Sequence, residues 1–461
     1  MSTVVERMGQ FVAGLKYEDL NEKVIDYAKR ILLDAIGCAY GGLESEPARM
    51  VRNAVHALSS SGQATIFGKN TKATAPYAAL ANGCAIRYQD YNDTFFGPGW
   101  TGHPSDNLSA LLAVAEWHEL TGRDFLLAMV AAYEVQTRFS DLPCPKLLWH
   151  RGWHHSTICS YAGAAGVAKL LGLDAGQVAH ALALSGARSN TFSEIRHGLI
   201  PMDKALSATI LASQSILYVL LAKQGFTGSS TLIEGPYGFR HALAGGVDVE
   251  PLVPKKGDFR ILKVGLKPYP VEAMVPAMVD AAVQIKDEFN VVPGEIESIR
   301  IFCSEEAMTK PSWDHSNLPP ATKEAADHSF YYCVAVALIA GEVTSKQFTD
   351  DWLRNPIVAT LMAKMGFEAK PEHTAMFKKE SVRSASIEIT TPRGVFNRGC
   401  LYPKGVWQNP MTWDDVKKKF VTQAESILTS TRMQEIMDRS FALEKEPNMR
   451  SFIEVLGGSA N

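Results

Sequence analysis

The chain has 461 residues, of which 46% are hydrophobic and 21% charged, and its formal net charge is −3. This length predicts two or three domains, and the composition is that of an ordinary soluble globular protein. The nearly balanced charge gives no reason to expect nucleic acid or an acidic membrane surface as a partner. Any site for an anion must therefore be local, built from a few lysine, arginine and histidine side chains.

The sequence has no apolar run as long as the roughly 20 residues of a membrane span, and its N-terminus does not resemble a signal peptide. Its seven cysteines are scattered and never spaced CxxC. We therefore expect reduced thiols, a cytoplasmic location, and neither a zinc ribbon nor an iron–sulfur cluster. P-loop, strand-borne GxGxxG, GxSxG and HExxH motifs are also missing, so the sequence gives no sign of nucleotide, metal or covalent hydrolase chemistry.

Residues 1–262 carry apolar residues at helical spacing almost throughout, which predicts an all-helical first domain. A glycine pair ends the first strong period, and Pro76 suits the first turn of a later helix. Residues 157–171 are crowded with alanine and glycine, which let backbones approach closely, so we expect this helix in the centre of a bundle. The expected helices lie at residues 23–42, 77–88, 108–120, 125–139, 157–171, 177–187 and 204–224.

The pattern changes near residue 260, where runs that alternate apolar and polar side chains indicate half-buried strands among helices. We predict a smaller α+β domain over residues 263–400, inserted into the helical chain. Residues 401–461 turn helical again and should return to the first domain, so the expected fold class is mainly α. The expected elements are strands at 299–303 and 382–390 and helices at 271–289, 330–340, 356–365, 412–420 and 422–440.

The segment 88–107 follows neither a helical nor a strand period and is predicted as a loop between two helices. Its sequence, YQDYNDTFFGPGWTGHPSDN, is rich in Gly, Pro, Asp and His. Long polar loops inside helical proteins are often functional. The alternative is a surface connection that ends in a helix N-cap at Ser105 or Asp106.

His103 lies in this segment between Gly102 and Pro104. Glycine allows a ligand to approach the backbone, and proline stiffens the loop. Because histidine titrates near neutrality, His103 is a candidate general acid or base. The alternative is a histidine that only bonds to its own loop.

His154 and His155 start the helix that is rich in small residues. A helix N-terminus favours anions through its free N–H groups and its dipole. Adjacent side chains point in different directions, so the two histidines are not expected to serve one site, and the pair is a poor metal motif. Either one could instead cap the helix or pack against it.

Two lysines stand where a cation is useful for binding an anion. Lys204 opens a helix, a locally unfavourable place for a cation unless it shares an anionic ligand with the helix N-terminus. Lys267 lies between the two predicted domains, where ligands commonly bind, and Lys263 is its neighbouring rival. The alternative for each is a solvated surface lysine.

The helix at 330–340 begins with His328 and Ser329 and carries Tyr331 and Tyr332 on different faces. A tyrosine hydroxyl can bond to a carboxylate or pass a proton when its pKa is tuned. The alternative for either tyrosine is packing in the core.

Taken together, several stretches resemble the MmgE/PrpD family over nearly the whole chain. This family comprises 2-methylcitrate dehydratases, cis-aconitate decarboxylases and iminodisuccinate epimerases. No single stretch would be specific for the family, but the set is. The stretches are LLDAIGCAYGG, QDYNDT, GHPSDN, GWHHST, AGVAKLLGL, DKALSA, LKPYP, DHSFYYCVA and YPKGVWQNPM.

The resemblance implies a homodimer with a large helical domain, an inserted α+β lid, and catalysis without metal or cofactor in a site between the two domains. It favours Lys267 over Lys263, His154 over His155 and Tyr332 over Tyr331. The implied catalytic residues are His103, Lys204, Lys267 and Tyr332, and the implied substrate-binding residues are Asp90, Thr94 and His154.

The implied substrate is a small di- or tricarboxylate held by Lys204, Lys267 and His154, with His103 and Tyr332 moving protons to and from a carbanion or enolate. GHPSDN resembles the bacterial dehydratases, whereas GWHHST resembles the decarboxylase pattern. We expect elimination of water from 2-methylcitrate. The alternatives are decarboxylation of cis-aconitate, epimerisation of a dicarboxylate such as iminodisuccinate and, more remotely, a non-catalytic helical dimer.

Overall fold

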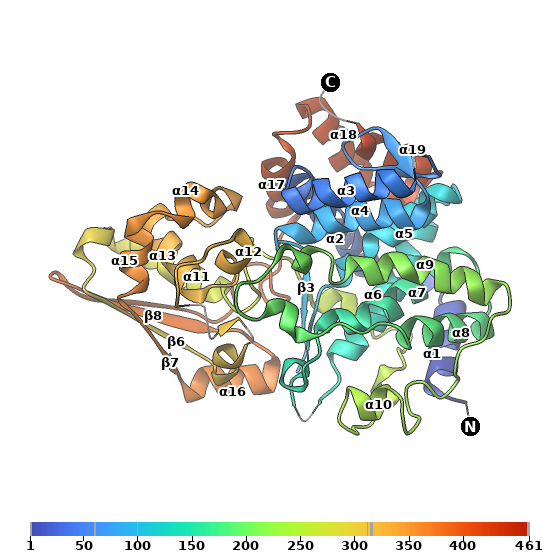
Figure 1. Cartoon of the computed structure of the whole chain (residues 1–461), viewed down its shortest axis with the longest axis horizontal. Coiled ribbons are helices and arrows are strands. Elements are labelled where there is room, and N and C mark those ends of the chain that lie inside the picture. Colours follow the sequence, from blue (N-terminus) through green and yellow to red (C-terminus); the bar gives the residue numbers. More distant parts are fainter. Residues whose placement is uncertain are drawn as a thin grey trace.

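The computed structural model describes residues 2–59, 61–98, 100–144, 146–310, 312–313 and 317–458. Figure 1 shows two bodies of unequal size, with both ends of the chain on the larger one. We call the larger one the helical body (residues 2–270 and 401–458) and the smaller one the α/β body (residues 271–400). Each has its own buried hydrophobic core. The chain therefore leaves the helical body once and returns to complete its core.

The helical body is built from helices whose apolar faces pack on one another, many of them started by a side-chain cap. Thr3 caps the first helix and Asn21 the second, each accepting a bond from a free backbone N–H. The helices are α1 (Val4–Gly14), α2 (Glu22–Gly42), α3 (Glu46–Leu58), α4 (Ala75–Tyr88), α5 (Leu108–Trp117), α6 (Gly122–Ser140), α7 (Cys159–Leu170), α8 (Ala175–Gly186), α9 (Thr209–Lys223), α10 (Phe239–Ala242), α17 (Trp413–Ala424), α18 (Ser430–Phe441) and α19 (Met449–Gly457).

Helix α7 lies at the centre of this body, in contact with α5, α6, α8 and α9. Its small residues permit that contact. A Cβ on Gly166 would lie 2.6 Å from Leu111 Cδ2, and one on Gly163 would lie 2.6 Å from Ser215 Oγ. The central position expected for the Ala- and Gly-rich helix is thereby confirmed.

The α/β body contains a four-stranded sheet in the order β7-β6-β8-β9, with β6 and β7 parallel and the other pairs antiparallel. Helix α11 packs on β8 and β9, and α13 packs on α11. The strands are β6 (Ser298–Cys303), β7 (Met365–Ala369), β8 (Ala385–Thr391) and β9 (Gly394–Cys400), and the helices are α11 (Pro276–Phe289), α12 (Lys323–Ala326), α13 (Phe330–Ala340), α14 (Asp350–Leu353), α15 (Pro356–Met362) and α16 (Pro371–Glu380).

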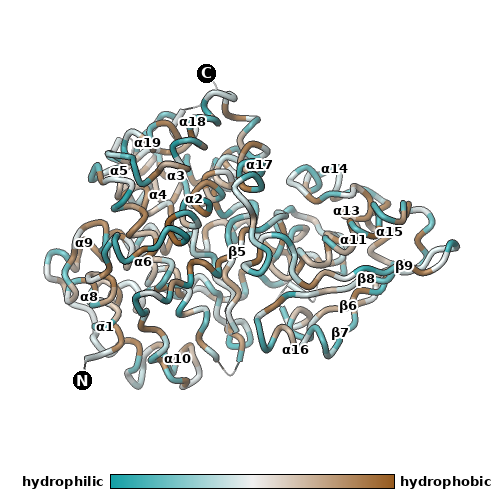
Figure 2. The backbone as a smooth tube through the Cα atoms, turned by 180° about the vertical axis from the view of Figure 1, so that it is seen from behind, coloured by the Kyte–Doolittle hydropathy of each residue, from teal (hydrophilic) through white to brown (hydrophobic). Residues whose placement is uncertain are grey.

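The segment 88–107 is more ordered than the predicted loop. It contains β3 (Thr94–Phe96), β4 (Thr101–Gly102) and a turn of 3₁₀ helix. Strand β3 also pairs with β5 (Val264–Gly265), which Figure 2 places at the junction of the two bodies. These strands are too short to produce a hydrophobic period, and their residues are nearly all buried, so the segment is not a surface connection.

The mainly α fold class is confirmed, and α13 has the bounds expected from its pattern. In the sheet, the two central strands β6 and β8 were predicted, but the edge strands β7 and β9 were not. Edge strands lack the buried face that produces strict alternation, and most residues of β9 are exposed or half-buried. The helix expected to reach residue 365 ends at Met362, since Met365 begins β7. A further short hairpin joins β1 (Ala64–Ile66) to β2 (Thr71–Ala73).

All seven cysteines are free thiols, as expected from their spacing. Five of them are buried. Of the helices that the structure describes, none combines the length and the apolarity needed to cross a bilayer.

Candidate active site between the two bodies

A cavity with about 570 Å³ of free space, open solvent at its mouth included, lies where the two bodies meet. The helical body contributes most of the wall, including three tryptophans and three histidines. The α/β body contributes Glu272 and Ala273 just before α11, Lys310 and Ser312 before α12, and His328 just after α12. The polar residues of the wall that could bind a substrate or move a proton are Asp90, His103, His154, His155, Arg196 and His328.

His103 is held in one tautomer by its own segment. Its Nδ1 lies 2.6 Å from the backbone carbonyl of Asp93 and 3.2 Å from the Thr94 hydroxyl. A carbonyl only accepts hydrogen bonds, so Nδ1 carries the hydrogen and Nε2 keeps its lone pair. Burial, together with the cations of Arg87 and Lys267, holds the pKa of His103 well below its usual range. The ring is therefore neutral near pH 7 and presents a proton acceptor in the cavity wall.

His154 has the opposite tautomer. Its Nδ1 accepts a bond from the backbone N–H of Ser156 at 3.3 Å, and the Ser156 hydroxyl lies 2.7 Å from the same nitrogen. The hydrogen of the neutral ring must then be on Nε2, which is buried and has no partner among the described residues. Burial and the nearby Arg196 cation hold the pKa of His154 well below its usual range. His154 therefore presents a donor where His103 presents an acceptor.

His155 belongs to the same site, which corrects the expectation that two adjacent histidines would not share one. Its ring lies 4.0 Å from that of His154 and 4.8 Å from that of His103, measured between centroids. His154 is the N-cap of the 3₁₀ turn over His155–Ile158 and has an extended backbone, so the two histidines are not neighbours within one regular helix, and both line the cavity. Its Nε2 accepts a bond from Arg196 at 3.0 Å.

Asp90 is the anion at the centre of a buried charge network. Lys267 Nζ lies 2.9 Å from Asp90 Oδ1, Lys204 Nζ lies 3.6 Å from Oδ2, and Arg87 donates to Oδ1. Burial alone would raise the pKa of Asp90, but Arg87, Lys204 and Lys267 hold it well below the usual range. The carboxylate is therefore charged at neutral pH, and the network places two of the predicted lysines beside a predicted substrate-binding residue.

Both lysines are bound by the protein itself. Lys267 Nζ donates to the Asp90 carbonyl at 2.7 Å, to Asp90 Oδ1 at 2.9 Å and to the Val271 carbonyl at 3.0 Å. An ammonium group has three hydrogens, so none is left for a substrate. Lys204 Nζ lies 2.9 and 3.0 Å from the two oxygens of Asp327. The arrangement leaves Lys267 no hydrogen for a substrate carboxylate, and both lysines bind protein carboxylates.

His328 joins this network to the cavity wall. Its Nδ1 donates to Asp327, and its Nε2 lies 3.4 Å from Asp90 Oδ2 and 3.5 Å from an Arg196 nitrogen. Burial and the Lys204 cation lower the pKa of His328 to about 4. It is neutral at physiological pH, so it does not add a positive charge to the site.

The structure does not bring Tyr332 or Thr94 to the cavity wall. Tyr332 is fully buried in the core of the α/β body, and its hydroxyl donates to the Gln347 carbonyl at 2.6 Å. Thr94 and Lys267 line a second, mostly apolar cavity, which shares Ala273 with the first. Thr94 still reaches the site indirectly through its contact with His103.

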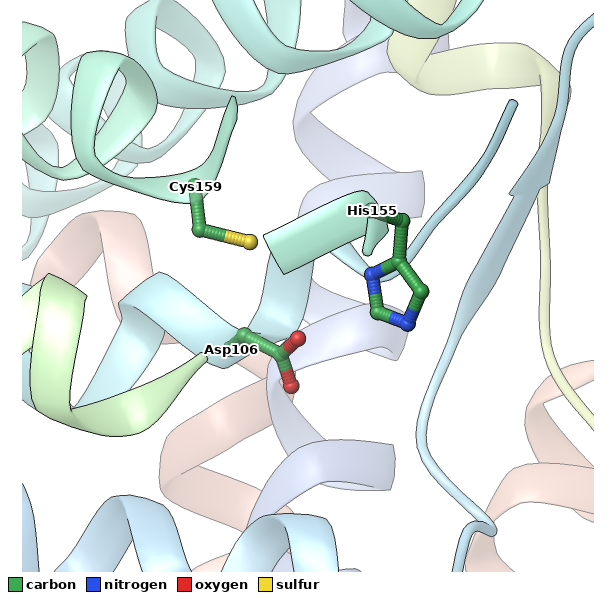
Figure 3. Close-up of side chains that lie close together, drawn as sticks. All are labelled: Asp106, His155 and Cys159. Carbon is green, nitrogen blue, oxygen red and sulfur yellow. The ribbon is translucent and has the colours of Figure 1, made fainter. Parts of the chain in front are cut away.

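Two clusters of the described residues have atoms that could ligate a metal ion. Figure 3 shows one of them, in which His155 and Cys159, from the 3₁₀ turn and the start of α7 that follows it, lie close to Asp106 from the turn before α5. Burial holds the pKa of the Cys159 thiol well above its usual range, so the thiol is protonated and a poor ligand. The other cluster consists of Asp90, Asp327 and His328. Lysines and Arg87 already balance its carboxylates, so neither cluster fits a metal ion well.

Residues that sequence reasoning missed complete the wall. Lys310 Nζ lies 3.1 Å from Glu272 Oε1 and 4.4 Å from the centre of the Trp149 ring. Arg196 and Glu272 stand in stretches with no recognisable pattern, so no local signal marks them. His328 was visible, because it lies in the DHSFYYCVA stretch that supports the family resemblance.

Comparison with known proteins identifies the family of this chain. The sequence matches the MmgE/PrpD N-terminal domain over residues 6–252 and the MmgE/PrpD C-terminal domain over residues 269–443. A cis-aconitate decarboxylase of Homo sapiens is 25% identical, and the alignment covers 93% of this chain and 89% of that protein. The 2-methylcitrate dehydratase of Escherichia coli (strain K12) is 25% identical over 86% of this chain and 83% of its own length. A probable 2-methylcitrate dehydratase of Saccharomyces cerevisiae is 28% identical over 74% of this chain and 69% of its own length.

The two domain matches together span most of the chain, and the first alone covers more than half of it. The chain therefore belongs to the MmgE/PrpD family.

Proposed function

We propose that the protein is a lyase that removes water from a small hydroxylated tricarboxylate, with 2-methylcitrate as the first substrate to test. The observation that supports this best is the pair of opposite tautomers in one cavity. His103 presents a lone pair at Nε2, and His154 presents a hydrogen at its own Nε2. Relatives named 2-methylcitrate dehydratase add to the argument.

In the proposed reaction, His103 Nε2 takes a proton from the carbon next to a carboxylate. The C–H electron pair becomes the new carbon–carbon double bond as the C–O bond breaks, and the hydroxide leaves with its bonding pair. Because the environment keeps the pKa of His103 low, its protonated ring is a strong acid and returns the proton to the hydroxide, which completes water. His154 donates its Nε2 hydrogen to a carboxylate of the substrate and so orients the substrate for this transfer.

A second candidate is decarboxylation of cis-aconitate, because the human decarboxylase aligns with a larger share of this chain than the dehydratases do. Decarboxylation needs an acid to protonate the carbanion after carbon dioxide leaves. A histidine that is neutral at pH 7 suits that role less well than it suits proton removal. Epimerisation of a dicarboxylate uses the same groups and remains the third alternative.

The experiment is proton NMR of the purified protein with 2-methylcitrate and, separately, with cis-aconitate, in deuterated buffer with chelator present. Conversion of 2-methylcitrate to 2-methylaconitate supports the proposal. Itaconate formed from cis-aconitate would replace it with decarboxylation, and deuterium exchange without net conversion would point to epimerisation. If the spectrum of neither acid changes, the dehydratase and decarboxylase hypotheses are both contradicted. The homodimer implied by the resemblance stays a prediction, which sedimentation velocity tests.

A further inference from the structure

Arg196 lines the cavity and has no carboxylate partner among the described residues. It donates to His155 Nε2 at 3.0 Å and lies 3.5 Å from His328 Nε2, and its Nε has no partner. Within the part of the chain that the structure describes, no carboxylate lies at ion-pair distance from this guanidinium. Lys310, the other cation of the wall, pairs with Glu272. Behind the wall, Arg87 and Lys267 pair with Asp90, and Lys204 pairs with Asp327.

Two neutral imidazoles satisfy hydrogen bonds of Arg196 but do not balance its charge. Taking a cation out of water without a counter-charge is costly, and the cost is recovered when an anion binds. Burial, with the neighbouring Arg87, lowers the pKa of Arg196 to about 10, which leaves the guanidinium charged at neutral pH. The wall of the cavity therefore contains a positive charge that the protein leaves unpaired.

A second hydrogen-bond donor lines the same cavity as Arg196. His154 Nε2 carries a hydrogen and is buried without a partner among the described residues. His155 connects the two groups, since its ring lies 4.0 Å from that of His154, measured between centroids, and its Nε2 is bonded to Arg196. Arg196 lies on the helical body, and its other neighbour His328 belongs to the α/β body, so the two donors lie where the bodies meet.

We propose that Arg196, with His154 as second donor, binds a substrate carboxylate that takes no part in the bond changes. This inference rests on the proposed function and assigns the residue that selects for an additional carboxylate. A guanidinium presents parallel N–H groups that match a carboxylate, whereas Lys267 has spent all three hydrogens on the protein and Lys204 faces both oxygens of Asp327. Arg196 thus takes the role that the sequence suggested for Lys204 and Lys267.

The test measures binding of propane-1,2,3-tricarboxylate, which has three carboxylates but no hydroxyl and cannot be dehydrated. Isothermal titration calorimetry would compare the wild type with Arg196→Gln and Arg196→Lys. We expect Arg196→Gln to weaken binding about 10- to 100-fold, the worth of a charge-assisted hydrogen bond. Arg196→Lys should fall between, since it keeps the charge but not the paired donors. The matched control is Arg188→Gln. Arg188 is an exposed arginine near the end of α8 that packs on Tyr218.

A purely structural role is separable by kinetics. If Arg196 binds substrate, Arg196→Gln should raise the KM for the acid that the enzyme turns over, by a factor similar to the loss of binding. If Arg196 only holds His155 and His328 in place, Arg196→Gln should lower kcat and leave the affinity for the tricarboxylate unchanged, which would overturn the proposal. Should the glutamine variant fail to fold, Arg196→Lys still decides between these results.

The inference and the proposed function can fail separately. Binding that depends on Arg196, in a protein that converts neither 2-methylcitrate nor cis-aconitate, would keep the carboxylate site and remove the proposed reaction. An active enzyme whose Arg196→Gln variant binds the tricarboxylate as the wild type does would keep the reaction and remove the site. A wild type that does not bind the tricarboxylate at all would also remove the site.

Discussion

Lys267 and Asp90 form a buried contact that ties the segment 88–107 to the start of the α/β body. Lys267 Nζ bonds to both the carboxylate and the backbone carbonyl of Asp90, and its third hydrogen goes to the Val271 carbonyl. Asp90 adopts a left-handed backbone conformation with φ of 52°, which side chains other than glycine adopt at a cost. The ionic bonds act on this positive-φ residue, and the third bond of Lys267 reaches the first residue of the α/β body.

Replacing Asp90 by Asn should therefore lower the free energy of unfolding by about 3–5 kcal/mol, because it leaves buried cations without their anion. Asparagine tolerates a positive φ, so the backbone itself would not cause the loss. Urea denaturation at pH 7 measures the change. The control is Asp350→Asn, which removes an exposed i,i+4 partner of Arg354 and should have little effect. Equal small losses in both variants would show that the buried network is not stabilising.

Asp93 should make stability depend on pH in the opposite sense from an ordinary ion pair. Burial raises the pKa of Asp93 to about 7, although Ser105 and Tyr133 donate to its carboxylate. The unfolded value is about 3.9, so the folded state holds a proton that the unfolded state has lost. The stability from this group is complete below pH ~4 and is lost as pH rises to about 7, on the order of 4 kcal/mol in total. Burial also raises the pKa of Asp106 to about 6, so Asp106 should likewise lower stability as the pH rises.

Asp93→Asn removes that dependence, because asparagine does not titrate. Its free energy of unfolding relative to the wild type should improve between pH 5 and pH 8, as measured by urea denaturation at each pH. Asp350→Asn, with its exposed carboxylate, serves again as the control and should show the same difference at both values. A constant difference for Asp93→Asn would mean that Asp93 is ionised throughout.

Replacing His103 by Gln should lower turnover about 10²- to 10⁴-fold if His103 moves the proton. Glutamine can keep a polar contact with the segment but cannot exchange a proton at neutral pH. His118→Gln is the matched control, since His118 is an exposed histidine at the end of α5. Steady-state kinetics on whichever acid the NMR experiment identifies gives the answer. A loss smaller than about tenfold would remove His103 from the mechanism.

The pH profile of kcat/KM provides an independent test of the same residue. His103 must be neutral to accept a proton, and burial with two nearby cations holds its pKa well below the usual range. Activity should then stay level as the pH falls from 8 to 6 and should decline only below that range. An acidic limb centred near 6.5, the ordinary histidine value, would indicate an acid or base in a solvated environment instead.

Tyr332→Phe should leave turnover nearly unchanged and lower stability by about 1–3 kcal/mol, since it deprives the buried Gln347 carbonyl of its donor. The matched control is Tyr331→Phe, because Tyr331 is only half-buried and packs against Phe367. Thermal denaturation and steady-state kinetics on both variants separate the two roles. A large loss of turnover for Tyr332→Phe alone would restore the catalytic role that the family resemblance implies.

Elements with a buried face were predictable, and elements without one were not. The central strands β6 and β8 bury one face against the core, so their apolar residues alternate with polar ones. Helix α13 is buried on nearly all sides and was predictable as a continuous apolar run. The residues of the edge strands β7 and β9 are exposed or half-buried, so these strands show no alternation of apolar and polar residues. The short strands of segment 88–107 failed for a different reason, because two or three residues cannot show a period.

The sequence by itself determined the family, the mainly α class and most of the chemically active residues, because apolar periodicity and short motifs are local properties. Only the tertiary structure decided how those residues are used. The tautomers of His103 and His154 depend on which backbone group each ring meets, and the lysines are occupied by carboxylates more than one hundred positions away. Arg196 became notable only when its lack of a counter-charge was visible, and that is a property of the folded surroundings rather than of any stretch of chain.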